Sequence, residues 1–458
     1  MTSPPVVPNI LALIGNTPMV EIKQFDTGPC RLFAKLETQN PGGSIKDRIG
    51  VSMIEAAEQS GALRPGGVIV EATAGNTGIG LAVVAAAKGY KLILAIPDKM
   101  STEKIQHLHG LGADVRITRT DVDKYHPANY INLAKSIAAE TPNSWLVDQF
   151  SNPYNPIAHE QTTGPEILQQ MEGDVDAVVC GVGSGGTITG LSRCFAAYSS
   201  KTELVLADPA GSSLGDYVRT GQLGASGSYA VEGIGQSSIP PVADLSSVHK
   251  AYTIPDARSF EVARALLRQG GILAGSSSGT LVAASLDYCR EQTEPKRVVT
   301  FICDSGNKYL SKMYNDHWML DQGYLQLPRT GDLQDLIMRR YQYGGVVTVG
   351  PDDSLLTAYQ RMRMADISQV PVMENGTPTG ILDESDVLIA VHKDEEHFRD
   401  PVRSAMTSRI KTVHASASLE EVYRVLDEGL VALIMDGEVF AGLITRTDLL
   451  NFMRRRLR

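Results

Sequence analysis

Apolar, β-branched runs alternate with amphipathic segments between about residues 45 and 325 of this 458-residue chain. Residues 46–63 have the spacing of an amphipathic helix that ends at Gly61, and residues 68–73 and 91–97 are typical of buried strands. The strand pattern recurs at residues 176–183, 203–209 and 297–304. This alternation predicts an α/β fold with mostly parallel sheets that helices cover on both faces. Ligands bind such folds at the carboxyl ends of the strands.

The pattern changes after residue 325, and an internal repeat follows. Residues 348–355 and 412–419 resemble each other, and each is followed by a helical segment and then by a longer segment, residues 369–388 and 431–450. The copies are offset by about 62 to 64 residues, which predicts a pseudo-symmetric pair that buries a shared face. The predicted parts are a first domain, a linker and two repeats, at residues 1–325, 326–340, 341–396 and 397–458.

Charge and composition exclude several classes of protein. The formal net charge of −10 argues against general nucleic-acid binding, which requires a concentrated basic face. No apolar run approaches the ~18 to 20 residues of a membrane span. The opening residues show no secretory pattern, and the five cysteines are scattered singly, as expected in a reducing compartment. These features predict a cytoplasmic protein that binds neither nucleic acid nor membranes.

The segment NPGGSIKDR, residues 40–48, places Lys46 at the start of a helix behind a Gly-Gly turn. The positive end of a helix dipole and partial desolvation both favour a neutral amine, which is the form that attacks an aldehyde. A Schiff base at Lys46 is therefore chemically reasonable. Taken alone, the segment favours a solvated lysine at a helix start, and the Schiff base gains support only from the other segments.

Three further segments carry small polar residues at strand ends. In TAGNTGIG, residues 73–80, backbone N–H groups with Thr73, Asn76 and Thr77 are suited to a carboxylate, although a plain strand-to-helix turn has the same pattern. In VGSGGTITG, residues 182–190, glycines with Ser184 and Thr187 favour a single phosphate. The spacing differs from the dinucleotide and P-loop patterns.

The fourth segment is ICDSGNKY, residues 302–309, in which Ser305 could hydrogen-bond a ring nitrogen or simply cap a helix. A hydroxyl partner leaves such a nitrogen largely unprotonated, which favours elimination at Cβ over transamination. Spacing indicates no metal site, because His107 and His109 are two residues apart and do not share a helix face.

These four segments, in this order, resemble the fold-type II pyridoxal-phosphate family of cysteine synthases and cystathionine β-synthases. The resemblance covers about residues 8 to 325. It lengthens the first segment to residues 35–48 and extends to three more segments, at residues 13–20, 149–167 and 231–240. It implies two α/β subdomains with mostly parallel sheets and pyridoxal 5'-phosphate as the cofactor.

The resemblance also implies roles for individual residues. Lys46 would be joined covalently to the cofactor aldehyde and serve as the catalytic residue, and Asn76 would bind the phenolic oxygen. Ser305 would bind the pyridine nitrogen. The cofactor phosphate would be held by Gly183, Ser184, Gly185, Gly186 and Thr187. The substrate carboxylate would be bound by Thr73, Gly75, Thr77 and Gln149. Ala74 stands where the family usually has serine, which removes one hydroxyl.

The repeat resembles a pair of CBS domains, a regulatory module that binds adenosyl ligands. The second copy, GLITRTD at residues 442–448, keeps the Gly-x-x-Thr-x-x-Asp pattern, so Thr445 and Asp448 would bind a ribose. The first copy has Asp383 where a hydroxyl residue is typical, and its charge would repel phosphates. The resemblance therefore implies at most one nucleotide site, with a purely structural dimerisation module as the alternative.

A catalytic core followed by this module is the architecture of cystathionine β-synthases. It implies condensation of serine with homocysteine to cystathionine, with hydrogen sulfide release from cysteine as a side reaction. The alternatives are cysteine synthesis from O-acetylserine and sulfide, and an adenosyl-nucleotide sensor whose core is degenerate. The core begins within about ten residues of the start, so haem is not expected. The resemblance to enzymes of this type also implies that the chain forms a homodimer or homotetramer.

Overall fold

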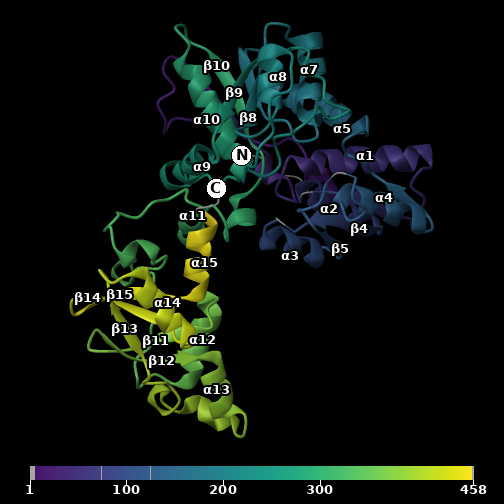
Figure 1. Ribbon diagram of the computed structural model, residues 1–458. Coiled ribbons are helices and arrows are strands. Elements are labelled where there is room, and N and C mark those ends of the chain that lie inside the picture. Colours follow the sequence, from purple (N-terminus) through teal and green to yellow (C-terminus); the bar gives the residue numbers. More distant parts are fainter. Residues whose placement is uncertain (1–5, 74, 99, 124, 456–458) are drawn as a thin grey trace. The chain divides into compact units, whose positions relative to one another are not determined.

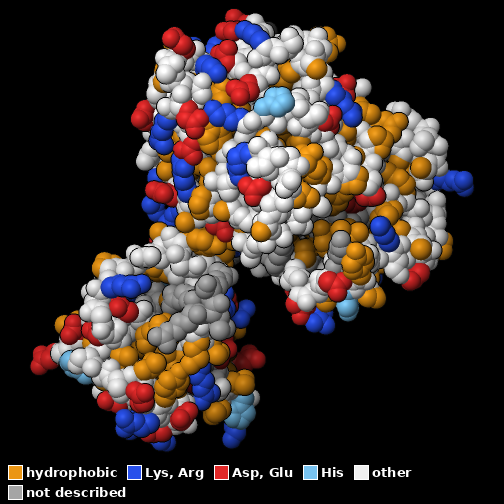
Figure 2. All heavy atoms as spheres, turned by 45° about the horizontal axis from the view of Figure 1, so that its top comes forward, with side chains coloured by type: hydrophobic (Ala, Val, Ile, Leu, Met, Phe, Trp, Pro, Cys, Tyr) orange, Lys and Arg blue, Asp and Glu red, His pale blue; other side chains and the backbone are white. Residues whose placement is uncertain are grey.

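The computed structural model describes residues 6–455 except residues 74, 99 and 124 (Figure 1). The chain forms two compact units, Met1–Asn315 and Asp316–Arg458. Acidic and basic side chains are interspersed over the face shown in Figure 2. No helix of the described residues has both the length and the apolar character needed to cross a bilayer.

A six-stranded sheet forms the larger part of the first unit, in the order β1-β2-β10-β7-β8-β9. Every pair is parallel except β1 with β2. The strands are β1 Met19–Ile22, β2 Arg31–Leu36, β7 Ala177–Cys180, β8 Glu203–Pro209, β9 Val248–Ile254 and β10 Arg297–Ile302. β7 and β10 are almost wholly buried, as expected for mainly apolar strands in a covered parallel sheet.

A second, four-stranded parallel sheet has the order β5-β4-β3-β6. Its strands are β3 Val68–Ala72, β4 Lys91–Pro97, β5 Asp114–Thr118 and β6 Ser144–Leu146. Strands β3 and β4, with helices α1 (Lys46–Ser60) and α2 (Asn76–Lys88), supply most of the apolar core on one side of this sheet. The prediction of two α/β subdomains with mostly parallel sheets is confirmed.

The helices of this unit connect successive strands (Figure 1). They are α1 Lys46–Ser60, α2 Asn76–Lys88, α3 Thr102–Gly110, α4 Tyr130–Glu140, α5 Tyr154–Ala158, α6 Gly164–Gln170, α7 Gly186–Tyr198, α8 Leu214–Thr220, α9 Asp256–Gly270 and α10 Ser276–Arg290. Short 3-10 segments lie at η1 Ile10–Leu13, η2 Glu37–Gln39 and η4 Gly306–Tyr309, and a π-helical turn at η3 His159–Thr163. α1 ends at Gly61, as predicted, because glycine accommodates the left-handed φ of 74° at its C-cap.

Glycines allow α1 and α2 to pack backbone against backbone. A β-carbon on Gly50 would lie 2.8 Å from the carbonyl carbon of Gly80, and one on Gly80 would lie 2.6 Å from the carbonyl oxygen of Lys46. Such distances exclude any larger residue without a shift of one helix. This close crossing brings the start of α1, which carries Lys46, next to the first turns of α2.

The second unit contains the two repeats. Each has a helix, an antiparallel strand pair and a second helix, and the register shifts between Val372 and Met373 in one repeat and between Ile434 and Met435 in the other. The strands are β11 Gln369–Glu374, β12 Thr377–Asp383, β13 Lys411–His414, β14 Ala432–Asp436 and β15 Val439–Ile444. The helices are α11 Asp316–Asp321, α12 Leu355–Ala365, α13 Glu384–Val391, α14 Leu419–Asp427 and α15 Arg446–Arg455, with 3-10 turns at η5 Leu333–Leu336, η6 Tyr341–Tyr343, η7 Glu395–Arg399 and η8 Val402–Ser404.

The segment predicted as a linker, residues 326–340, contributes to a hydrophobic core. Leu333, Leu336 and Ile337 are buried with Val413 and Val422 of the second repeat. The boundary between the compact units falls between Asn315 and Asp316, ahead of the predicted boundary at residue 325.

Candidate active site

Three segments that are far apart in the sequence converge at the carboxyl ends of β3 and β10. The backbone N–H of Ser305 donates to the carbonyl oxygen of Gly43 at 3.1 Å, and that of Ile45 donates to Cys303 at 2.9 Å. The side-chain nitrogen of Asn76 donates to Asp304 at 2.8 Å. The predicted residues Lys46, Asn76 and Ser305 are therefore brought into one site.

Lys46 is the first residue of α1, and its backbone N–H donates to the hydroxyl of Ser44 at 3.2 Å. Burial lowers the pKa of the Lys46 amine, and the neighbouring Cys303 and Asp304 act in the opposite direction. Desolvation dominates because a charged amine loses more hydration free energy on burial than a neutral one. The site thus favours a neutral, nucleophilic amine.

Asn76 is held by two charged side chains that sequence reasoning did not identify as functional. Its amide oxygen accepts from Lys308 Nζ at 2.9 Å, while its amide nitrogen donates to Asp304 Oδ2 at 2.8 Å. Asp304 Oδ2 also accepts from the Tyr309 hydroxyl at 2.7 Å. Asp304, Lys308 and Tyr309 all lie in residues 302–309. The signal in the sequence for these three residues was the presence of charged and phenolic groups in a segment that follows a strand.

Ser305 caps the short η4 turn, because its hydroxyl oxygen accepts from the backbone N–H of Asn307 at 3.3 Å. The hydroxyl proton takes no part in this bond and can serve a second acceptor. The capping role considered from the sequence is therefore present, and binding of a ring nitrogen stays a prediction.

The predicted carboxylate-binding residues come together at the start of α2. Gly75 N–H donates to the hydroxyl of Thr73 at 3.1 Å, and the hydroxyl of Thr77 donates to Gln149 Oε1 at 2.6 Å. Gly75 has a φ of 123°, and a β-carbon there would lie 2.7 Å from Lys104 Cδ. Backbone N–H groups of the first helical turn and buried hydroxyls suit an anion. Ala74 lies outside the described residues.

The predicted phosphate loop, formed by Gly183, Ser184, Gly185, Gly186 and Thr187, forms the start of α7. Gly185 is the N-cap with a φ of 93°, and the described residues provide no side-chain cap for the amides that follow. A β-carbon on Gly183 would lie 2.3 Å from the Gly233 carbonyl oxygen, and one on Gly185 would lie 2.4 Å from Ala243 Cβ. These positions therefore require glycine, and the uncapped N–H groups suit a phosphate.

Asn155 links the phosphate loop to the carboxylate-binding residues. Its side-chain nitrogen donates to Ser184 Oγ at 2.8 Å and to the Gln149 carbonyl oxygen at 2.8 Å. Asn155 Oδ1 is buried and has no hydrogen-bond partner among the described residues. Asn155 lies in α5, within the segment of residues 149–167 that carries the family resemblance, and an amide between two binding segments was the only signal in the sequence.

His159 supports the same loop from the π-helical turn. Its Nε2 lies 3.3 Å from Thr187 Oγ1, and its Nδ1 lies 2.9 Å from Thr163 Oγ1. Burial holds the pKa of His159 well below its usual range, and the charge of Arg48 adds to the effect. A neutral ring joins Thr187 to the protein interior, and π-helical turns are often retained at functional sites.

An ionic cluster borders the start of α2. Lys104 of α3 contacts Glu232 at 2.5 Å, and Lys312 contacts the other carboxylate oxygen of Glu232 at 2.7 Å. Burial opposes ionisation of Glu232, but the two ammonium groups hold its pKa below the ordinary value. Lys104 belongs to the smaller sheet's layer, and Glu232 belongs to the loop beside the phosphate site, so the cluster joins the two subdomains.

The two repeats differ at the predicted nucleotide positions. In the second repeat, the hydroxyl and backbone N–H of Thr445 donate to Asp448 Oδ2 at 2.6 and 2.7 Å, which orients the carboxylate. In the first repeat, Asp383 and Asp386 form a reciprocal capping box at the start of α13. Thr445 and Asp448 make the same two capping bonds, so the repeats differ in charge, and the two carboxylates of the first repeat disfavour an anion there.

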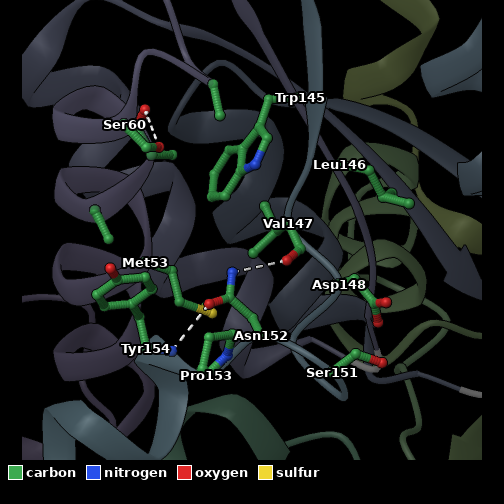
Figure 3. Close-up of a pocket in the computed structure, with 13 residues that line it drawn as sticks. Met53, Ser60, Trp145, Leu146, Val147, Asp148, Ser151, Asn152, Pro153 and Tyr154 are labelled. Atoms are coloured by element: carbon green, nitrogen blue, oxygen red, sulfur yellow. Dashed lines mark hydrogen bonds between the residues drawn. The ribbon is translucent and has the colours of Figure 1, made fainter.

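A separate hollow lies beside α1 (Figure 3). It is bordered mainly by apolar groups, among them Met53, Trp145 and Tyr154, and contains none of the predicted site residues. Asn152 is held there by its donation to Val147 O and by the N–H of Tyr154. Among the described residues, no cluster of His, Cys, Asp or Glu is arranged to hold a metal ion.

Comparisons with known proteins agree with this geometry. Residues 10–304 match the family of pyridoxal-phosphate dependent enzymes, and residues 333–393 and 402–455 match the CBS domain. Cystathionine beta-synthase of Oryctolagus cuniculus is 35% identical over 475 residues, covering 99% of this chain and 86% of the rabbit protein. Cysteine synthase A of Escherichia coli (strain K12) is 42% identical over 302 residues, covering 65% of this chain and 92% of that enzyme.

A solved structure, that of a hydrogen sulfide-producing enzyme from Fusobacterium nucleatum, superimposes with a TM-score of 0.63 and 36% sequence identity. The superposition covers 67% of this chain and 100% of the chain in the solved structure.

Proposed function

The chain belongs to the pyridoxal-phosphate dependent enzymes, in the family of the cystathionine β-synthases, and we propose that it condenses L-serine with L-homocysteine to give L-cystathionine and water. One observation carries the proposal: the similarity to cystathionine beta-synthases extends over the catalytic domain and both CBS domains. Similarity to cysteine synthase A covers only 65% of the chain.

The enzyme is pyridoxal-phosphate dependent, and the described residues fit that cofactor. The glycine loop offers uncapped N–H groups in a cradle that a β-carbon would fill. Lys46 offers a desolvated amine, Asn76 a second amide N–H, and Ser305 a hydroxyl proton. When bound, the cofactor supplies the electron sink for negative charge at the substrate α-carbon.

The residues of the chain would act as follows. The N–H groups at the start of α2, with Thr73, Thr77 and Gln149, would hold the serine carboxylate. The freed amine of Lys46 would remove the α-proton and later return it, a role that its lowered pKa supports. The bond between Cβ and the serine hydroxyl breaks, water leaves, and the homocysteine sulfur forms the new bond to Cβ.

Borohydride reduction followed by peptide mapping tests the assignment of Lys46. We expect the reduced cofactor on Lys46, and a Lys46→Ala variant should lose turnover by several orders of magnitude. A label on another residue, or a variant with full turnover, would refute the assignment.

The competing reaction is synthesis of cysteine from O-acetylserine and sulfide, which the 42% identity to cysteine synthase A favours. Initial rates with serine plus homocysteine, set against those with O-acetylserine plus sulfide, separate the two. We expect the first pair to have the higher kcat/KM. A preference for the second pair would replace the proposal, and release of sulfide from cysteine would reveal the side reaction.

A sensor with a degenerate core is the non-enzymatic alternative. The convergence of Lys46, Asn76 and the glycine loop argues against this alternative, because a core that has lost its activity is not expected to retain these contacts. A purified protein that carries the cofactor's visible absorbance would dispose of this alternative.

At the second repeat, Thr445 and Asp448 would bind the ribose of an adenosyl ligand, with S-adenosylmethionine as the first candidate. The oriented carboxylate of Asp448 supports this role. Calorimetry of the full chain with S-adenosylmethionine, AMP and ATP is the test; no binding of any of the three would leave a structural module.

The chain would work in the cytoplasm as a homodimer or homotetramer. The five cysteines are free thiols, and four of them are buried, as suits a reducing compartment. Light scattering of the purified protein reports the subunit number, and a monomer would contradict the proposed assembly.

A further inference from the structure

The ammonium group of Lys308 is enclosed by three acceptors. Its Nζ donates to the carbonyl oxygens of Gly42 and Gly43 at 2.9 and 3.1 Å and to Asn76 Oδ1 at 2.9 Å. An ammonium group has three N–H donors, so these contacts use its full capacity. The side chain joins the turn before Lys46, the first residue of α2 and the η4 segment.

These contacts determine which way the Asn76 amide faces. A lysine ammonium can only donate, so the atom that faces Lys308 must be the amide oxygen. A carboxylate can only accept, so the atom that faces Asp304 must be the amide nitrogen. The reversed amide would place a donor against Lys308 and an acceptor against Asp304, leaving buried polar groups unpaired.

The amide nitrogen of Asn76 carries two hydrogens, and the contact with Asp304 uses one of them. We infer that Lys308 is a positioning residue, which turns the Asn76 amide so that its second N–H faces the phenolic oxygen of the bound cofactor. This inference rests on the proposed function, because it requires the cofactor in the site.

The charge of Lys308 reinforces the effect of its geometry. The groups that face it are Asp304 at the end of β10, Asp47 of α1, and Lys104 and His107 of α3. Burial lowers the pKa of Lys308 to about 8, against the attraction of Asp304 and Asp47. The side chain thus remains mainly protonated near neutral pH, and a cation bonded to Asn76 polarises the N–H that points at a phenolate.

The test is a pH titration of the cofactor's visible absorbance in the loaded enzyme without substrates. We expect Lys308→Met to move the titration midpoint upward by about one pH unit and to weaken cofactor binding about tenfold, because the phenolate loses its oriented donor. Lys88→Met, which removes a lysine from the other end of α2, should leave both values unchanged.

A double-mutant cycle separates positioning from a structural role. If Lys308 acts through Asn76, the variant Asn76→Ala with Lys308→Met should behave like Asn76→Ala alone in both readouts. Additive shifts, or an unchanged midpoint in folded Lys308→Met, would overturn the inference.

Lys308→Gln replaces the methionine variant if that variant does not fold, and loss of fold in both would show that Lys308 only secures the Gly42–Gly43 turn. A wild-type chain without a lysine-linked cofactor would instead refute the proposed function.

Discussion

The side-chain oxygen of Asn155 occupies the space in which residue 186 would carry a β-carbon. A β-carbon built on Gly186 would lie 1.8 Å from Asn155 Oδ1. The nitrogen of the same amide bonds both Ser184 and the Gln149 carbonyl oxygen. One buried side chain therefore determines the shape of the glycine loop and connects it to the residues proposed to bind the substrate carboxylate.

Gly186→Ala should weaken cofactor binding by at least about tenfold, because the added methyl group must displace Asn155 or the start of α7. Fluorescence or absorbance titration of the apoenzyme with pyridoxal phosphate measures the change. Gly110→Ala is the matched control, since beyond the backbone of α3 and the chain neighbours no described atom lies within 4 Å of a β-carbon at that position. Equal affinity in both variants would show that the loop tolerates the methyl group.

Asn155→Leu keeps the approximate size of the side chain and removes two hydrogen bonds. We expect the dissociation constant for the cofactor and the KM for serine both to rise about tenfold, as the loss of ~1 to 2 kcal/mol predicts. Asn152→Leu also removes two hydrogen bonds, but in the hollow beside α1 (Figure 3). That variant should lower the melting temperature and leave the cofactor affinity unchanged; the same loss of affinity in both would point to general destabilisation.

Glu71 of β3 provides a prediction for stability against pH. Burial raises the pKa of Glu71 to about 8, and Glu71 Oε2 has no hydrogen-bond partner among the described residues. The folded chain therefore keeps a proton that the unfolded chain releases above its ordinary pKa of 4.5, so stability falls as the pH rises from about 4.5 to 8.

Glu71→Gln should remove this pH dependence and gain at least ~1 kcal/mol at pH 8. Denaturant unfolding followed by the fluorescence of Trp145, in a Trp318→Phe background, reports on the sheet that contains Glu71. Glu55→Gln, at a half-exposed position of α1, is the control. Parallel stability curves for wild type and Glu71→Gln would show that Glu71 is ionised in the folded chain.

Asp448→Asn should weaken binding of an adenosyl ligand about tenfold or more, because ribose hydroxyls lose a charged acceptor. Burial raises the pKa of Asp448 and the bonds from Thr445 lower it. Asp386→Asn, the corresponding change in the first repeat, should leave binding unchanged, because the additional carboxylate of Asp383 repels phosphates and no ligand is expected there. Calorimetry on the full chain that found equal losses would indicate two equivalent sites.

The sequence alone was sufficient for the fold class, the repeat and the family. Parallel strands buried on both faces have uninterrupted apolar sequences, and a duplicated unit repeats its pattern at a constant offset, so both are visible in one dimension. The segments around Lys46, Asn76 and Ser305 were also recognisable, because their glycines and small polar residues follow directly after strands.

Only the tertiary structure revealed how these segments act together. Asn76 and Asp304 are separated by 228 positions, and Lys308 and Asn76 by 232, yet each pair forms a direct hydrogen bond. Asn155 lies 29 positions from Ser184 and has no sequence pattern that indicates the contact. Hydrogen bonds act over about 3 Å, so a residue's partners depend on which strand ends lie side by side in the sheets and on how closely Gly50 and Gly80 let two helices approach.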